Sequence, residues 1–148
     1  MEAETKVADV MVTEVVTINP DATLAQAAEV MRDANVGMLP IVEEDGKLRS
    51  VVTDRDIVVR AVARGIEPDT TPVKNLDTED VVSARPEWDV EEAMRLMAER
   101  QIGRIPVVDA ERRVVGVVTL SSLILRARDQ EKVLDTAEEV ARRSSRVA

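Results

Sequence analysis

An internal repeat constrains this sequence more than any other feature. Residues 7–58 align with residues 73–124 at a constant offset of 66 positions without a gap, and 12 of the 52 paired positions are identical. A unit of about 50 residues has only a marginal core when it folds alone. We therefore expect the two repeats to pack through their sheets with pseudo-twofold symmetry. The identical pairs are Val7/Val73, Val15/Val81, Val16/Val82, Pro20/Pro86, Ala27/Ala93, Met31/Met97, Gly37/Gly103, Pro40/Pro106, Val42/Val108, Val51/Val117, Val52/Val118 and Thr53/Thr119.

Both repeats predict the same order of elements, β-α-β-β-α, which makes the chain an α/β protein. Each begins with a short extended segment that ends at a proline, where a helix cannot readily continue. A helix follows, in which apolar residues recur at i, i+3, i+4 and i+7. Two apolar strands come next, and a closing helix begins at Thr53 or Thr119. The strands are predicted at 37–42 and 48–53 in the first repeat, and at 103–108 and 114–119 in the second.

Glycine and proline mark the boundary between the repeats. Residues 64–72 contain Gly65, Pro68 and Pro72 and form the predicted linker, which is too short to let the repeats separate widely. This places the first repeat at 7–63, the second at 73–128, and a C-terminal helix and tail at 129–148. The C-terminal helix has an apolar stripe that needs a covering surface, either the body of the protein or a second chain. The stripe consists of Val133, Ala137, Val140 and Ala141.

The residue types that the chain lacks exclude several functions. It has no His and no Cys, so it cannot build a Ser-His-Asp triad, a Cys-His pair, or a zinc site with imidazole or thiolate ligands. Its net charge of −9 and its scattered basic residues disfavour nucleic-acid binding. No apolar run approaches the ~20 residues of a membrane span, and the N-terminal residues lack a signal-peptide pattern. We expect a soluble, cytoplasmic protein that binds neither nucleic acid nor membranes.

Two matching motifs carry a family resemblance. In the first repeat, Gly-Met-Leu-Pro-Ile-Val at 37–42 is followed by Ser-Val-Val-Thr-Asp-Arg-Asp at 50–56. In the second, Gly-Arg-Ile-Pro-Val-Val at 103–108 is followed by Gly-Val-Val-Thr at 116–119. Together with the duplicated β-α-β-β-α order, these motifs resemble the CBS-domain family, whose domains pair into Bateman modules. The resemblance covers about residues 7–125, and the Thr-Asp-Arg-Asp-Ile-Val run looks especially like small stand-alone bacterial CBS-pair proteins.

This resemblance implies a non-catalytic regulatory module. Paired CBS domains commonly bind AMP, ADP, ATP, other adenosine derivatives or magnesium, and two pairs often stack into a disc-shaped homodimer. The resemblance thus predicts an adenine nucleotide as the ligand, a homodimer, and no required cofactor. Because no effector domain is recognisable in the chain, the regulatory output is expected to reach a separate effector protein.

Thr53 and Asp56 are the strongest candidates for ligand binding. They lie where a strand turns into a helix, and their spacing predicts a capping box, in which each side chain accepts a hydrogen bond from the other residue's backbone N–H. Members of the resembled family use this Thr-x-x-Asp pattern to bind ribose. A carboxylate suits that role because it accepts hydrogen bonds from two ribose hydroxyls.

The second repeat departs from this pattern. It keeps Thr119 but has Ser122 where the first repeat has Asp56. A hydroxyl accepts a weaker, uncharged hydrogen bond, so two unequal clefts between the repeats are predicted. The better cleft combines Thr53 and Asp56 with Ala84, Ile102 and Gly103, and the poorer cleft combines Thr119 and Ser122 with Ile18, Val36 and Gly37.

A phosphate group would need a cation. Arg104 is predicted either as an ordinary exposed residue or as a phosphate clamp beside the second cleft, and Arg55 and Lys74 are the other candidates. The acidic run at 43–45 is most simply a solvated turn, since magnesium would need further oxygen ligands from elsewhere. No metal site is therefore predicted.

Two other functions are weighed against the nucleotide-binding module. The first is a ligand-free scaffold for dimerisation or protein interaction, in which Ser122 marks a decayed site. The second is an enzyme acting through Asp54, Asp56 or a lysine, which the repeat makes unnecessary because it already explains these residues. The C-terminal helix is the candidate surface for an effector protein.

Overall fold

The computed structural model describes residues 5–78 and 80–145 and divides them into two compact units. One unit consists of Val16–Val81 and Ala110–Val114, and we call it the first-repeat unit. The other consists of residues up to Val15, Val82–Asp109 and residues from Val115 onward, and we call it the second-repeat unit.

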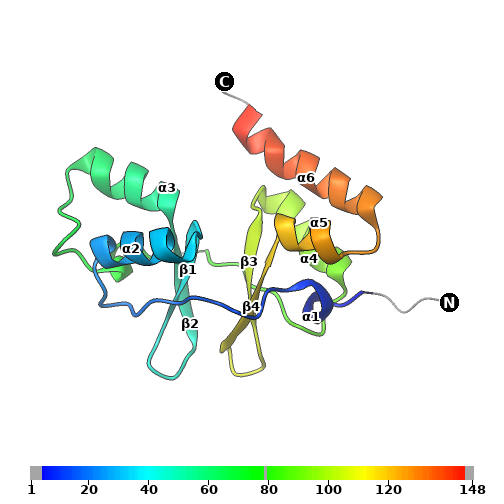
Figure 1. The fold of residues 1–148 in the computed structure, drawn as a ribbon, viewed down its shortest axis with the longest axis horizontal. Coiled ribbons are helices and arrows are strands. Elements are labelled where there is room, and N and C mark those ends of the chain that lie inside the picture. Colours follow the sequence, from blue (N-terminus) through cyan, green and yellow to red (C-terminus); the bar gives the residue numbers. More distant parts are fainter. Residues whose placement is uncertain (1–4, 79, 146–148) are drawn as a thin grey trace. The chain divides into compact units, whose positions relative to one another are not determined.

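The first-repeat unit contains a helix, a two-stranded antiparallel sheet and a closing helical segment, in the predicted order (Figure 1). In the sheet, Leu39 lies opposite Val52, and Ile18 extends the sheet through a parallel bridge to Ile41. The elements are α2 (Leu24–Ala34), β1 (Met38–Val42), β2 (Leu48–Thr53), α3 (Asp54–Asp56), a π-helical turn η1 (Ile57–Ala61), a 3-10 turn η2 (Val62–Arg64) and a 3-10 turn η3 (Val73–Leu76).

The caps and the buried stripe of helix α2 explain where the helix begins, where it ends and which side it buries. Thr23 caps its first turn by accepting the N–H of Gln26, and the Gln26 side chain accepts the N–H of Thr23 in return. The helix ends at Asn35, which adopts the left-handed conformation with φ 55°. Its buried stripe of Leu24, Ala27 and Met31 packs into the core with the inward residues of the sheet.

The second-repeat unit has the same arrangement and one additional helix. Ala84 pairs with Val107 in a parallel bridge, as Ile18 pairs with Ile41 in the other unit. The predicted α/β order is confirmed in both units. The elements are α1 (Val7–Val10), α4 (Val90–Arg100), β3 (Arg104–Val108), β4 (Val114–Thr119), α5 (Leu120–Arg126) and α6 (Gln130–Ser145).

The opening segments of the two repeats are exchanged between the units. α1 opens the first repeat, yet it belongs to the second-repeat unit, where the Val7 N–H donates to the Trp88 carbonyl at 2.9 Å. η3 opens the second repeat, yet it belongs to the first-repeat unit, where the Val73 N–H donates to the Ala22 carbonyl at 2.7 Å. Each unit is therefore completed by chain from the other repeat, an arrangement that the sequence did not predict.

Each exchanged segment contacts the second strand of its host sheet in a different way. Residues 11 and 12 pass so close to Gly116 that a Cβ there would lie 2.7 Å from the Met11 Sδ and 3.0 Å from the Val12 carbonyl oxygen. The equivalent residue in the first-repeat unit is Ser50, whose buried Oγ accepts the Thr78 N–H at 2.8 Å. The first contact thus depends on the absence of a side chain at Gly116, and the second depends on a hydrogen bond from Thr78 to Ser50.

Helix α6 packs against α4 and α5 of its own unit (Figure 1). Val133 and Thr136 are buried, and Val140 is half-buried, so the body of the protein supplies the surface that the predicted stripe requires. Ala141 is exposed, so its assignment to the stripe was wrong. Among residues 5–78 and 80–145, no helix combines the length and the apolar character needed to cross a membrane.

Candidate ligand-binding site

The turn from β2 into α3 holds the strongest predicted site residues. The Asp56 N–H donates to the Thr53 Oγ1 at 3.0 Å, and the Thr53 N–H donates to the Asp56 Oδ2 at 3.0 Å. This confirms the predicted capping box. The Asp56 side chain remains 21% exposed, so the cap does not bury its carboxylate.

The second oxygen of this carboxylate faces an arginine. The Asp56 Oδ1 lies 3.6 Å from Nη1 of Arg60, one helical turn further along the chain. Arg60 also donates from Nη1 to the Leu76 carbonyl in η3 at 2.9 Å. Arg60 was not among the predicted site residues, although its position four residues after Asp56 is the usual spacing for an ion pair on a helix.

Gly37 adjoins the same turn through its backbone. Its carbonyl accepts the Asp54 N–H at 2.9 Å, which fixes the start of α3 beside the start of β1. Val36 precedes it with an exposed side chain, whereas Ile18 is buried in the core of this unit. The first-repeat unit therefore brings Thr53, Asp56 and Gly37 together.

The equivalent turn in the second-repeat unit uses its polar atoms differently. Ser122 Oγ accepts the Thr119 N–H at 3.0 Å and donates to the Thr119 carbonyl at 2.9 Å, while the Ser122 N–H donates to Thr119 Oγ1 at 2.9 Å. Ser122 is only 3% exposed. Its hydroxyl hydrogen is already committed, which leaves it less to offer a ligand than Asp56.

Gly103 repeats the role of Gly37, since its carbonyl accepts the Leu120 N–H at 3.0 Å. A Cβ at Gly103 would lie 3.3 Å from Leu120 Cδ1 and 3.7 Å from Val140 Cγ1 of α6. Ile102 is half-buried and Arg104 is exposed. Ala84 is fully buried, and its N–H donates to the Pro106 carbonyl.

Thr53 and Asp56 belong to one unit, and Ala84, Ile102 and Gly103 belong to the other. The predicted clefts between the repeats therefore stay predictions, as does the assignment of Arg104 to a phosphate.

The other candidate cations differ in their contacts. Lys74 donates to the Asp21 carboxylate at 2.8 Å, and this hydrogen bond holds the pKa of Asp21 below its usual value. Arg55 is exposed at the start of the closing helical segment. Within residues 5–78 and 80–145, no cluster of three or more acidic side chains could hold a metal ion.

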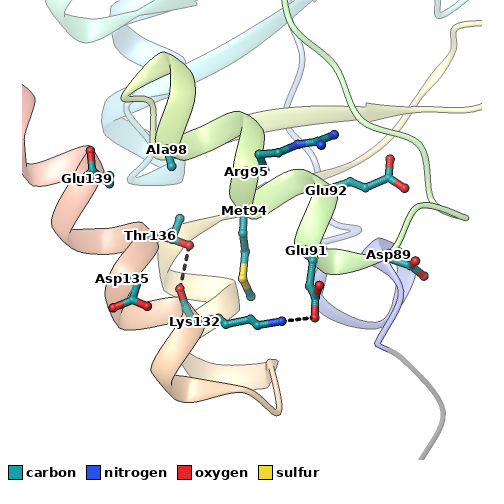
Figure 2. Close-up of a pocket in the computed structure, with 10 residues that line it drawn as sticks. All are labelled: Asp89, Glu91, Glu92, Met94, Arg95, Ala98, Lys132, Asp135, Thr136 and Glu139. Atoms are coloured by element: carbon teal, nitrogen blue, oxygen red, sulfur yellow. Dashed lines mark hydrogen bonds and ion pairs between the residues drawn. The ribbon is translucent and has the colours of Figure 1, made fainter.

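A groove of about 490 Å³ lies between α4 and α6, and its lining contains none of the predicted site residues. Figure 2 shows Met94 between the two helices and Lys132 reaching across to Glu91. Its lining is rich in carboxylates, but three of them are already paired with basic side chains. These ion pairs are Lys6–Asp89, Lys132–Glu91 and Arg142–Glu139.

Comparison with known proteins identifies the family. The model of the CBS domain matches residues 7–62 and 73–129, which together make up most of the chain. The chain belongs to the CBS-domain family. Both repeats are matched, so the chain carries a tandem CBS pair.

Relatives of this CBS-pair chain include proteins of similar length. The CBS domain-containing protein YhcV of Bacillus subtilis is 40% identical over 125 residues, covering 84% of this chain and 87% of YhcV. The crystal structure of Hypoxic Response Protein I with two coordinated zinc ions is 33% identical with a TM-score of 0.76, covering 82% of this chain and 98% of that one.

A third relative was solved with adenosine compounds. The CBS domain pair of protein MJ0100, in complex with 5′-methylthioadenosine and S-adenosyl-L-methionine, is 30% identical. It has a TM-score of 0.73, and the match covers 82% of this chain and 94% of that one. CBS pairs similar to this chain thus bind adenosine ligands.

Proposed function

We propose that this CBS pair is a non-catalytic regulatory module that binds an adenosine-type nucleotide such as AMP, ADP or ATP. The observation that carries the proposal is the Asp56 carboxylate, which stays accessible while only its Oδ2 takes part in the helix cap. A carboxylate in this state can accept hydrogen bonds from ribose hydroxyls. The adenosine compounds bound by the MJ0100 CBS pair support the proposal.

In this proposal, Thr53 and Asp56 bind the ribose, and Ala84, Ile102 and Gly103 of the other repeat contact the base. Arg55 is a proposed phosphate contact, and Arg104 is the proposed phosphate contact beside the second site. A second site with Thr119, Ser122, Ile18, Val36 and Gly37 would be weaker, because the Ser122 hydroxyl is buried and already donates to a backbone carbonyl.

Calorimetric titration of the nucleotide-stripped protein with AMP, ADP, ATP and S-adenosylmethionine tests this function. We expect micromolar binding of one compound, and we expect Asp56→Asn to weaken it roughly tenfold to hundredfold, since hydrogen bonds to a charged group contribute ~1.5–3 kcal/mol. Ser122→Ala removes the corresponding side chain of the weaker site and should change the affinity of the first site less than about twofold.

Binding that survives Asp56→Asn would move the site to the second repeat. No heat with any of the four compounds would favour the alternative function, a ligand-free scaffold. Turnover of a nucleotide would favour an enzyme instead.

We also propose that the module is a homodimer. The closing helices of the two repeats expose apolar residues at equivalent positions, Val58 and Val59 in one unit and Ile124 and Leu125 in the other. Leu125 is 80% exposed, and repeated apolar exposure of this kind is typical of an interaction surface.

Light scattering of a Val59→Asp/Leu125→Asp variant tests this assembly. We expect a monomer, whereas Leu134→Asp on α6 should leave a dimer. A wild-type monomer would contradict the proposal.

In the proposed function, the regulatory output passes from the CBS pair to an unidentified effector protein in the cytoplasm.

A further inference from the structure

We propose that Arg60 is a positioning residue that holds the Asp56 carboxylate in place for the ribose and links it to the exchanged segment η3. This inference rests on the proposed nucleotide binding at Thr53 and Asp56. The inference adds Arg60, which lies outside the Thr-x-x-Asp motif, to the proposed site.

The geometry places Arg60 between two fixed groups. Its Nη1 lies 3.6 Å from the Asp56 Oδ1 and donates to the Leu76 carbonyl at 2.9 Å. The same nitrogen, Nη1, makes both contacts: it donates to the Leu76 carbonyl and stays within ion-pair distance of the Asp56 Oδ1. The bond to the backbone of η3 anchors the arginine, so it is not a freely moving surface side chain.

The two oxygens of Asp56 are thereby restrained by different partners. Oδ2 accepts the Thr53 N–H, and Oδ1 faces the Arg60 guanidinium. Together these contacts limit rotation of the carboxylate before a ligand arrives. A restrained carboxylate loses less conformational entropy when it binds hydroxyl groups, which strengthens binding.

The second repeat contains the matching arginine without the carboxylate. Arg126 stands 66 positions after Arg60 and donates to the Met11 carbonyl at 2.9 Å, at the end of the exchanged helix α1. Position 122 is a serine, so no acidic residue stands one helical turn before Arg126. Anchoring of the exchanged segment is thus common to both arginines, and contact with a ligand-binding carboxylate is specific to Arg60.

This difference supplies a matched experiment. Affinities for AMP and for S-adenosylmethionine are measured by calorimetry in wild type, Arg60→Gln, Asp56→Asn, the double variant and Arg126→Gln. Since neighbouring residues of one ion-pair network act on binding together, we expect Arg60→Gln to weaken binding roughly threefold to tenfold. It should weaken binding no further when it is combined with Asp56→Asn. Arg126→Gln should change the affinity less than about twofold while lowering the melting temperature about as much as Arg60→Gln does.

Two further measurements separate positioning from a loss of structure. Arg60→Lys keeps the positive charge, so it should recover part of the affinity and serves as the test variant if Arg60→Gln does not fold. Hydrogen exchange at residues 73–78 should slow when the ligand binds to wild type and to Arg126→Gln, but not when it binds to Arg60→Gln.

Three results would overturn the inference. If Arg60→Gln binds as wild type while Asp56→Asn does not, Arg60 has no positioning role and the proposed function stands. If Arg60→Gln weakens binding by the same factor with and without Asp56→Asn, it acts independently of the carboxylate. If wild type binds neither compound, the proposed function and this inference fail together.

Discussion

The turns that open α3 and α5 have the same backbone arrangement, but only the first contains an acidic side chain that caps the helix. In both, a threonine caps the helix, a glycine carbonyl fixes its first N–H, and an arginine seven residues after the threonine donates to an exchanged segment. Asp56 stands in one turn and Ser122 in the other. Both residues accept the N–H of the capping threonine at 3.0 Å. The cap therefore needs an oxygen but not a charge, and the second oxygen of Asp56 takes no part in it and faces Arg60.

The largest expected effect comes from exchanging these two residues. Asp56→Ser should abolish measurable nucleotide binding at the first repeat. The cap itself should persist, because a serine already completes the same cap in α5. Ser122→Asp places a carboxylate four residues before Arg126 and should add a second binding event in calorimetry. An unchanged stoichiometry in Ser122→Asp, with the protein folded by circular dichroism, would mean that the acidic residue alone does not make the site.

A smaller effect, on the free energy of unfolding, is expected where the exchanged segments contact the sheets. Gly116→Ala should lower the free energy of unfolding by about 1–3 kcal/mol, because the added Cβ would overlap Met11 and the Val12 carbonyl. Its counterpart Ser50→Ala should cost about 1–2 kcal/mol, since the Thr78 N–H loses its acceptor. Urea denaturation measures both, and a neutral Gly116→Ala would show that the segment shifts easily.

The capping threonines should give equal effects. Thr53→Ala and Thr119→Ala each remove the side-chain acceptor of one cap and should each destabilise the fold by about 1 kcal/mol. Only Thr53→Ala should also weaken nucleotide binding. Thermal melts with and without AMP separate the two effects, and equal loss of binding in both variants would contradict the assignment of the site to the first repeat.

The smallest effect is a pH dependence confined to the first-repeat unit. Hydrogen bonding and charge from Lys74 lower the pKa of Asp21 below its ordinary value of 3.8. A lowered folded-state pKa contributes stability that is present above 3.8 and is lost as the pH falls through the lowered value. Asp21 is exposed, so solvent screens the pair. Asp21→Asn should therefore lower the urea midpoint slightly at about pH 6 and not at about pH 2. A larger loss at the lower pH would contradict this direction of the pH dependence.

Much of each unit could be predicted from local patterns. The offset of 66 located the strands and main helices of both repeats, and the Thr53 and Asp56 spacing predicted the capping box that the structure contains. These features depend on residues that are close in sequence, so periodicity and capping chemistry are enough to find them.

The exchange of opening segments could not be predicted in the same way. Residues 7–12 and 73–78 occupy equivalent positions of the repeat, so the sequence pattern does not distinguish packing on the same repeat from packing on the other one. The contact of Arg60 with the carbonyl of Leu76 could not be predicted for the same reason, because Leu76 lies in the exchanged segment. These residues are distant in sequence and come together only in the folded chain.

The exchanged segments also bear on how such a chain could arise. A polypeptide with only one repeat would have an opening segment that packs on the sheet of another copy. Its own sheet would lack an opening segment. Two copies would complete each other by trading these ends, and a gene duplication joined through a peptide like 64–72 would turn that mutual complementation into one molecule. Fragments cut within 64–72 should accordingly reassemble when mixed, with each fragment supplying the end that the other lacks.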